Sequence, residues 1–492
     1  MLLLQTRCAI PPAMLASRRH WLLSVLSAAA AAGGCGGSES LPNKRGTNND
    51  AAELEKPLRV LVIDNAETAE RIERYWSSRS DAPFELKQAT AEAALGQPRL
   101  VADVVIFRTN LLGDLAEAGK IAPLERSFVD GEAFRSHELL EYARTSEVLW
   151  GKQTEVICLG SPPLVLYYRA DLLAAKKLSP PTNWEQYLQV VKALAHKPEG
   201  TGEAWSPSIE PSAGRWGGVT LLAWVASYAR HRSEYAALFD LESMVPLIEQ
   251  PPYVRALEEL VAVAKLRSPA HNDFTPSDAK IALYAGDCAL AWSWPTSAPR
   301  TSESKVEATI AQHISIAELP GSRAVYNFGA QRWEEREAGE SIHVPLLGVA
   351  GLSAAITTTA RKLRAAENFL AWLSASDEVV EIFSANSNST CFRTPQLAQV
   401  GRWCEPGLPS TGAQAYVDVL EKTQRHAVTL LVPHIPGGEK YLQALGTAVR
   451  CAVSGTTSVA DSLKVAASQF EEITNSLGRD KQQAAYRRSL GL

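Results

Sequence analysis

The sequence predicts an α/β protein built on a doubly wound, parallel sheet. Short apolar runs of strand length alternate with segments of helical periodicity, which is the pattern of parallel strands joined by helices. The first three predicted strands are Leu58–Ile63, Phe84–Ala89 and Val101–Phe107, and the helices between them are Ala66–Trp76 and Ala91–Leu95. The composition is that of an ordinary globular protein, with 46% hydrophobic and 21% charged residues. A length of 492 residues suffices for two or three domains.

The later chain continues this alternation. A strand at Leu164–Tyr168 is followed by a helix near Asp171, a Pro-Pro turn, and a helix beginning at Trp184 whose N-cap is Thr182 or Asn183. Further helices are expected at Leu111–Ala118, Thr220–Tyr228, Tyr253–Leu266, Lys362–Leu373, Asp377–Phe383, Tyr441–Ser454 and Val459–Ile473, with a helix and strand across Asp278–Trp294 and a glycine-containing strand at Leu347–Ile356.

The N-terminus has the pattern of an exported lipoprotein. A charged segment with Arg18 and Arg19 precedes twelve apolar residues from Trp21 to Ala32, then small residues and Cys35. Twelve residues are too few to span a bilayer as a helix. We therefore expect a signal peptide at 1–34, lipidation of Cys35, and a flexible tether at 35–56 that anchors the chain on the periplasmic side of the cell envelope.

Alternatives remain open for this segment. The Arg18-Arg19 pair resembles a twin-arginine export signal, Met14 could be the true start, and a plain secretory signal cut elsewhere fits the same pattern.

The charge balance gives no indication of nucleic-acid binding. There are 49 Lys and Arg residues against 54 Asp and Glu residues, a net charge of −5. Cys391 and Cys404 lie in a polar loop and could pair in an oxidising compartment. No Cys-x-x-Cys occurs, so neither a zinc site nor a redox motif is indicated.

Polar residues follow two of the predicted strands. Because ligands bind beyond the carboxyl ends of strands in such sheets, these positions are expected at the rim of a cleft. They are Asp64, Asn65, Arg108, Thr109 and Asn110.

Three stretches carry a family resemblance. The first runs from Pro162 to Glu185 and contains Pro162-Pro163, Asp171-Leu172-Leu173 and Pro180-Pro181-Thr182-Asn183-Trp184-Glu185. The second is LAEAGKIAPL at 115–124, and the third is the C-terminal part with Pro433-x-x-Pro436 and Gly455-Thr456-Thr457. The order of these motifs resembles that of bacterial extracellular solute-binding proteins of the maltose-binding type, over roughly Leu58 to Leu477. The resemblance implies a periplasmic-binding-protein-like fold: two discontinuous α/β lobes, 57–162 with 347–424 and 163–346 with 425–492, joined by a hinge and holding ligand between them.

The resemblance also implies ligand contacts. The loop after the third strand supplies Phe107 to Asn110, the Trp-containing segment 197–218 supplies Trp216 and Glu210, and the loop 384–395 supplies Arg393. Two positions at which the family often has an aromatic ring are Thr296 and Leu442 here. Their replacements are expected to be Trp292 or Trp294, which would share one face of a strand, and Tyr441.

The sequence lacks the common catalytic signatures. Gly-x-Ser-x-Gly, His-Glu-x-x-His and the glycine-rich phosphate loops are absent, and no cofactor or metal is expected. Adjacent tyrosines bind ferric ion in another branch of this fold. Tyr167 and Tyr168 would, however, face opposite sides of a strand and so could not reach one metal.

The sequence therefore favours a monomeric, extracytoplasmic receptor that delivers a sugar-like solute to the permease subunits of an ABC importer and breaks no bond. Two alternatives remain: a surface carbohydrate hydrolase on a similar two-lobed scaffold, and a sensor or adhesion module that has lost ligand binding.

Overall fold

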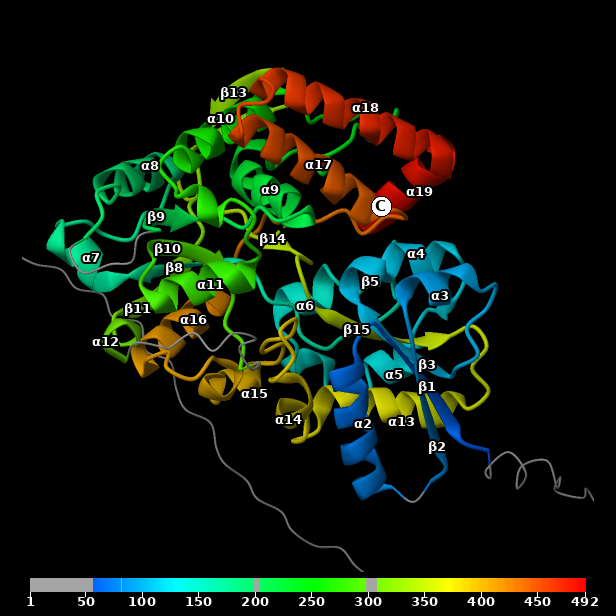
Figure 1. Cartoon of the computed structure of the whole chain (residues 1–492). Coiled ribbons are helices and arrows are strands. Elements are labelled where there is room, and N and C mark those ends of the chain that lie inside the picture. Colours follow the sequence, from blue (N-terminus) through cyan, green and yellow to red (C-terminus); the bar gives the residue numbers. More distant parts are fainter. Residues whose placement is uncertain (1–55, 81, 199–203, 298–307) are drawn as a thin grey trace, which may run out of the picture. The chain divides into compact units, whose positions relative to one another are not determined.

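The computed structural model describes residues 56–80, 82–198, 204–297 and 308–492 (Figure 1). Residues 54–492 form one compact unit, to which all described residues belong. The predicted signal peptide, Cys35 and the tether up to residue 55 lie outside the described residues. Within the described ranges, no helix combines the length and the apolar character needed to cross a membrane.

The first sheet contains the parallel strands that the sequence predicts. β1 (Leu58–Ile63) pairs in parallel with β2 (Phe84–Ala89) and β3 (Val104–Arg108). β15 (Leu352–Thr357), which lies far along the chain, joins antiparallel to β3. β4 (Ile121–Ala122) and β7 (Ile157–Cys158) both pair with β15. The sheet is therefore assembled from two separated pieces of the chain.

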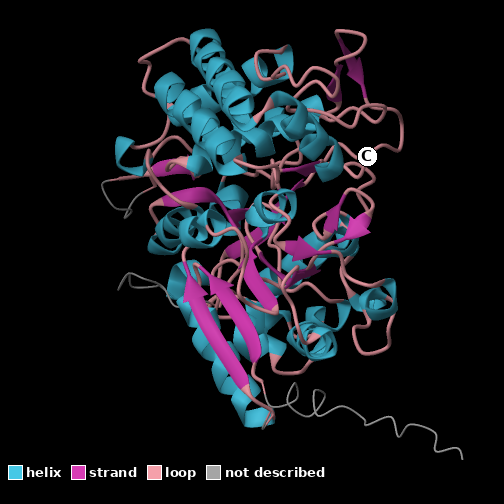
Figure 2. Cartoon of the chain, turned by 90° about the vertical axis from the view of Figure 1, so that its right-hand side faces the viewer, coloured by secondary structure: helices cyan, strands magenta, loops and turns pink. Residues whose placement is uncertain are grey.

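Helices cover this sheet on two sides. Figure 1 shows α3 (Ala91–Gly96) and α4 (Leu112–Glu117) above the strands and α13 (Leu363–Ala375) below them. α2 (Ala66–Arg79) and α14 (Val379–Phe383) pack together, and the ring of Trp76 meets Phe369 edge-on at 4.9 Å. In Figure 2 long strands (magenta) lie in front of the helix (cyan) that covers them.

The second sheet has the order β11-β8-β10-β9. β8 (Val165–Arg169) is antiparallel to both β10 (Cys288–Ser293) and β11 (Ile314–Glu318), and β9 (Ser206–Ile209) is parallel to β10. The helices associated with it are α7 (Ala170–Ala175), α8 (Trp184–Ala193), α9 (Arg215–Ala229), α10 (Pro251–Ala264) and α11 (Pro276–Ala285). As expected, Asn183 caps α8, its side chain accepting from the Gln186 N–H.

A cluster of tryptophans forms the core beside the second sheet. Trp184 stacks on Trp224 with ring centroids 4.2 Å apart, and Trp292 lies 5.6 Å from both rings. All three side chains are at most 1% exposed. Trp292 and Trp294 were expected to share one face of a strand. That prediction is wrong, because β10 ends at Ser293 and Trp294 lies in the next segment, against Trp216.

Helix α9 is longer than predicted. Its apolar pattern suggests Thr220–Tyr228, but the structure begins the helix at Arg215. Trp216 therefore lies in the first turn of a helix and not in a loop. The extension is possible because Gly217 and Gly218 allow α17 (Gly438–Val453) to cross close by, where larger side chains would collide with its backbone.

The connections between the two sheets run side by side. Leu352 donates its N–H to Gly160 O (3.0 Å), and Leu159 donates to Leu352 O (2.9 Å). Gly351 has φ +129°, and a Cβ there would stand 2.7 Å from Gly160 O. Gly348 has φ +70° and faces the imidazole of His434 in the same way. Gly351 thus permits the close backbone approach that the sequence predicts, and Gly348 leaves room for the His434 ring.

The C-terminal part returns to the second sheet. α16 (Ser410–Thr423) packs on β11, although the boundaries predicted from sequence assign it to the first lobe. β16 (Leu430–Leu431) pairs with β14 (Leu346–Leu347), and α17, α18 (Val459–Leu477) and α19 (Arg479–Ser489) follow. The sequence did not predict α19. Its Arg488 reaches across to Glu117, with the closest N–O distance 2.6 Å.

The remaining elements are short. They are η1 (Thr109–Leu111), α5 (Arg126–Val129), η2 (Ser136–Glu138), α6 (Glu141–Thr145), β5 (Leu149–Trp150), β6 (Gln153–Thr154), η3 (Pro269–His271), α12 (Ala308–Ala311), β12 (Ala324–Asn327), β13 (Arg332–Glu335), α15 (Thr394–Leu397) and η4 (Val400–Trp403). Cys391 and Cys404 are both buried and free, so the permitted disulfide is not formed.

Candidate functional site

A pocket lies where the carboxyl end of β3 meets the N-terminus of α9. It encloses about 490 Å³ of space between protein atoms, part of it open to solvent. We call it the strand-end pocket. Its lining residues come from five separate segments and are Arg108, Thr109, Asn110, Arg215, Trp216, Gly348, Val349, Ala350, Gly351, Asn388 and Glu439.

The floor of the strand-end pocket is fixed by backbone contacts. Thr109 donates its N–H to Gly351 O (3.1 Å), and its hydroxyl lies 2.9 Å from the hydroxyl of Ser353 on the neighbouring strand β15. The turn after β3 is therefore fastened to the returning chain. This contact sets the direction in which Arg108 and Asn110 leave the sheet.

The opposite wall is built by two helix N-termini. Arg215 of α9 lies 2.8 Å (Nε to Oε2) from Glu439 of α17 and donates from Nη1 to Val349 O at 3.4 Å. Its guanidinium carbon is 4.8 Å from the centroid of the Trp216 ring. Burial lowers the pKa of Arg215, and the Glu439 carboxylate opposes that shift. Glu439 also accepts from the amide of Asn110 at 3.4 Å.

A second hollow adjoins the first and shares Trp216 and Asn388 with it. It is lined further by Trp294 and Thr296, and the rings of Trp216 and Trp294 are 5.7 Å apart. Trp294 donates its indole N–H to Ser387 O at 2.7 Å, which fixes the ring. Two aromatic rings therefore line this hollow beside polar side chains, an arrangement that suits a ligand with C–H faces and hydroxyl groups.

The structure brings together five of the twelve residues predicted as ligand contacts. Arg108, Thr109, Asn110 and Trp216 line the strand-end pocket, and Trp294 lines the adjoining hollow. The other seven are placed elsewhere: Asp64, Asn65, Phe107, Glu210, Trp292, Arg393 and Tyr441.

Three of these seven serve the first sheet. Asn65 caps α2, accepting from the Thr68 N–H, and Asp64 accepts from the Ala91 N–H at 3.2 Å. Both side chains thus satisfy backbone donors at helix starts. Phe107 is fully buried in the core of the sheet, because it precedes the strand end by one residue and points to the packed face.

Glu210 and Trp292 belong to the interior beside the second sheet. Glu210 pairs with Arg267 at 3.2 Å, both side chains being at most 2% exposed, and it accepts from the hydroxyl of Tyr187. Trp292 donates its indole N–H to the same tyrosine. A buried charge needs a partner and hydrogen bonds, and Glu210 finds both within the protein, so its carboxylate is not available to a ligand.

Tyr441 and Arg393 are likewise structural. Tyr441 is fully buried against Phe239 and Phe470, with its hydroxyl 2.9 Å from that of Thr474. Arg393 donates to Phe134 O (2.6 Å) and to the hydroxyl of Ser374 (2.7 Å), away from the strand-end pocket. Tyr441 faces inward because α17 lays one apolar face on α9 and α18.

Sequence reasoning missed three polar lining residues, besides the loop 348–351. Arg215 precedes Trp216 directly, and Glu439 lies two residues before Tyr441, so each stands beside a residue that was chosen. Asn388 lies in the polar loop 384–395 from which Arg393 was chosen instead. The sequence thus indicated the right segments but not the right residues within them. Which side chains face the pocket depends on where α9 and α17 begin.

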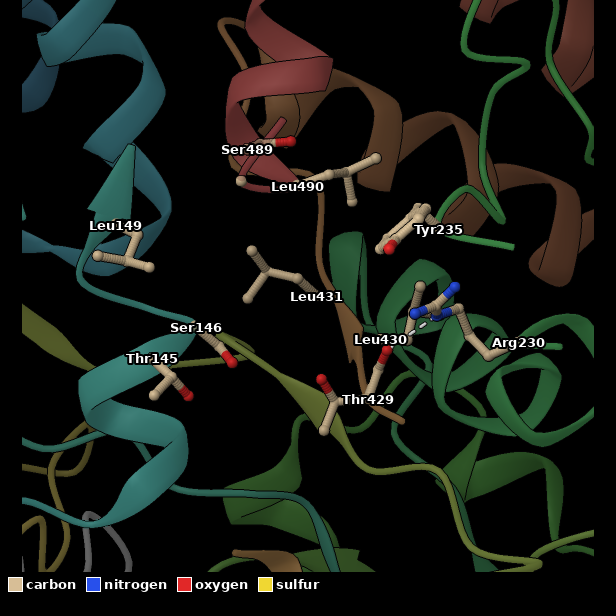
Figure 3. Close-up of a pocket in the computed structure, with 11 residues that line it drawn as sticks. Thr145, Ser146, Leu149, Arg230, Tyr235, Thr429, Leu430, Leu431, Ser489 and Leu490 are labelled. Carbon is tan, nitrogen blue, oxygen red and sulfur yellow. Dashed lines mark hydrogen bonds between the residues drawn. The ribbon is translucent and has the colours of Figure 1, made fainter. Parts of the chain in front are cut away.

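A further pocket lies at the other end of α9 (Figure 3). Arg230, the C-cap of α9, lines it and donates from Nε to Thr429 O at 2.9 Å. Leu149, Leu430, Leu431 and Leu490 supply apolar side chains, and Tyr235 is its one aromatic lining residue. None of the predicted contact residues lines this pocket. The strand-end pocket is the better candidate for a ligand site, because it lies at the carboxyl end of a parallel strand and combines aromatic with charged groups.

Within the part of the chain that the structure describes, no group of three or more His, Cys, Asp or Glu side chains is placed to hold a metal ion. The strand-end pocket contains one carboxylate, Glu439, and two guanidinium groups, from Arg108 and Arg215. This donor set can bind and orient a polar molecule through hydrogen bonds and charge.

Comparison with solved structures shows the same fold in several solute-binding proteins. A protein of Agrobacterium radiobacter K84, an ABC transporter solute-binding protein in complex with ribitol, has TM-score 0.61 and 16% identity, covering 85% of this chain and 100% of that one. A solute-binding protein from Thermotoga lettingae TMO, bound with α-D-tagatose, has TM-score 0.60 and 14% identity over 85% and 99% of the two chains. Maltose-bound T. maritima MalE3 has TM-score 0.56 and 17% identity over 85% and 99%.

A search of curated protein sequences found no match. The family model described as bacterial extracellular solute-binding protein matches residues 79–395, a range that includes most of both sheets and reaches from α2 to α15. The resemblance seen in the sequence motifs is confirmed by this match, and the chain belongs to the bacterial extracellular solute-binding protein family.

Proposed function

We propose that this protein is the extracytoplasmic receptor of an ABC importer and that it binds a sugar-like or polyol solute in the strand-end pocket. The observation that carries the proposal is the pocket itself, where the Trp216 ring stands beside Asn110, Arg215 and Glu439. An aromatic face accepts the C–H side of a sugar, and the polar groups bind its hydroxyls. Proteins with the same fold are solved with ribitol, tagatose and maltose.

In this proposal the protein binds and releases its solute without breaking a bond. Two discontinuous lobes close around the ligand by a hinge motion. One is built on 57–162 with the chain from 347 onward, the other on 163–346 with 425–492, and α16 (Ser410–Thr423), which packs on β11, belongs with the second. The pocket takes residues from both, since Arg108 precedes the first crossover and Arg215 follows it. A ligand that contacts both walls stabilises the closed form by its differential affinity. Closure would appear as a ligand-dependent decrease in the radius of gyration in solution scattering.

Export and anchoring complete the proposal. The signal peptide at 1–34 directs export, with Arg18-Arg19 as its twin-arginine signal, and a lipid on Cys35 holds the receptor near the permease subunits. Metabolic labelling of cells with a radioactive fatty acid tests the anchor. The label is expected on the protein and is expected to be lost in Cys35→Ala.

Replacing Trp216 with alanine is expected to weaken solute binding about tenfold or more, which is roughly 1.4 kcal/mol. The substitution removes the ring that lines both hollows while leaving the polar groups in place. Titration calorimetry against a panel of monosaccharides, oligosaccharides and polyols measures the loss. The matched control is Trp333→Ala, which removes a partly exposed indole from the β12–β13 hairpin, a residue that lines neither hollow.

Unchanged affinity in Trp216→Ala, with the thermal unfolding midpoint preserved, would remove this pocket from the proposal. Binding of none of the sugars and polyols by the parent protein would overturn the proposed solute class altogether.

A further inference from the structure

The strand-end pocket is richer in hydrogen-bond donors than in acceptors. The Nη2 of Arg215 is buried and donates to no acceptor among the described residues. Its Nε lies 2.8 Å from Glu439 Oε2 in an ion pair, which leaves Nη2 without an acceptor. A buried donor without a partner destabilises the unliganded protein, and it does so more strongly when it is charged. The arginine is therefore held in a position that an acceptor from a ligand would satisfy.

Arg108 adds a second guanidinium to the same pocket. Its side chain is exposed and forms no hydrogen bond or ion pair with any described residue. Its charge is close enough to Arg215 to repel it. Two like charges facing one space raise the free energy of the unliganded protein, and a negative charge between them relieves that cost.

The acidic groups of the pocket do not balance these charges. Glu439 is the one acidic residue in its lining, and 43% of its side chain is exposed. Its carboxylate is shared between Arg215 and the amide of Asn110. Arg108 is thus left with a full positive charge that no neighbouring side chain offsets.

The backbone supplies further donors. Val349, Ala350 and Gly351 line the pocket, and their N–H groups donate to no described acceptor. The positive φ angles of Gly348 and Gly351 give this short loop its turn. Backbone amides next to two guanidinium groups are a set of donors that suits the oxygens of an anion.

We propose that the solute of this receptor is anionic: a hydroxylated, sugar-like molecule carrying a carboxylate or phosphate group that Arg215 and Arg108 bind. The inference rests on the proposed receptor function and narrows its ligand class. The planar fork of a guanidinium matches both groups bidentately, and the Trp216 ring covers the apolar face of the same molecule.

The test compares sugars that differ by one charged group. Calorimetry on the purified protein uses glucose, glucuronate and glucose 6-phosphate, and likewise galactose with galacturonate and ribitol with ribonate. At least one acidic member is expected to bind ten times more tightly than its neutral counterpart. Carboxylate and phosphate are distinguished by which acidic member binds. The preference is expected to shrink as salt is raised from about 20 to about 500 mM, because salt screens the attraction between the arginines and the acidic group.

Variants assign the preference to the two arginines. Arg215→Gln is expected to weaken binding of the acidic sugar at least ten times more than binding of the neutral one, so that the preference for the acidic sugar is lost. Arg108→Gln is likewise expected to reduce the preference for the acidic sugar. It carries no risk to the fold, since the Arg108 side chain forms no hydrogen bond or ion pair with any described residue. The control Arg232→Gln removes one positive charge from a surface ion pair with Glu337, outside the pocket, and is expected to keep the preference.

Each remaining outcome counts against the inference. Neutral sugars binding as tightly as their acidic counterparts would overturn it and leave the receptor function standing. A preference for acidic sugars that survives in both Arg215→Gln and Arg108→Gln would remove it from this pocket. Binding of neither kind of sugar would overturn both this inference and the function on which it rests.

Discussion

Replacing Gly446 with valine is expected to destabilise the folded protein by about 3 kcal/mol. Gly446 lies at the point where α17 crosses α9, and a Cβ there would stand 2.0 Å from the carbonyl oxygen of Gly214. Backbone cannot yield as a flexible side chain does, so the two helices must separate. The gain in helix propensity over glycine, below about 1 kcal/mol, is too small to offset that cost.

The crossing also positions the site. Gly214 directly precedes Arg215 and Trp216, so displacement of its carbonyl group moves both lining residues. Urea-induced unfolding followed by tryptophan fluorescence measures the loss of stability. Gly96→Val is the matched control, because Gly96 is the exposed last residue of α3 and a Cβ there meets nothing within 4 Å. Equal stability of the two variants would show that α9 and α17 do not pack as closely as described.

Glu147→Gln is expected to stabilise the protein at pH 8 by about 3 kcal/mol more than it does at pH 4. Glu147 is fully buried, and burial raises its pKa from 4.5 to about 7, against the hydrogen bonds that it accepts from the Ser161 hydroxyl (2.6 Å) and the Gly348 N–H (2.8 Å). Its second oxygen, Oε2, has no partner among the described residues.

The sign follows from proton binding. Between pH 4.5 and about 7 the folded protein holds a proton on Glu147 that the unfolded chain has lost, so this group makes stability fall as pH rises. Glutamine does not titrate and removes that fall. His434, whose pKa burial lowers to about 4, gives the opposite slope, but it does so in both proteins and cancels in their difference.

The measurement is the urea midpoint of parent and variant at several pH values from 4 to 8. Glu132→Gln, the loss of an exposed carboxylate, provides the reference for removing one solvated charge. If the difference in urea midpoint between parent and Glu147→Gln were the same at pH 4 and pH 8, the folded protein would not hold the extra proton on Glu147. The result bears on function, because Glu147 ties Ser161 and Gly348, which lie on the two connections between the sheets.

Local sequence patterns predicted most of the regular structure. The strands β1, β2 and β8 and the helices α2, α8, α10 and α18 lie where periodicity and caps indicate, with ends that differ by a few residues. Helix ends were the weak point. α9 begins at Arg215, five residues before its predicted start, because Gly217 and Gly218 read as loop residues while they serve a close helix crossing.

The site could be predicted only in part. The residues after β3 were found because the carboxyl end of a parallel strand is a position that the sequence specifies. Aromatic rings were harder, since Trp216 and Trp294 line the hollows while Trp292 and Tyr441 fill the core. All four are large aromatic rings, and the sequence does not show which face of its element each ring occupies.

Residue types and their spacing by themselves determined the α/β class, the family and the order of the elements, because alternation and capping act between near neighbours in the chain. Only the tertiary structure decided that α16 packs on the second sheet and that Arg215, Glu439 and Arg108 meet in one pocket. Such contacts join residues hundreds of positions apart, and their free energy comes from burial and charge that exist only once the chain has folded.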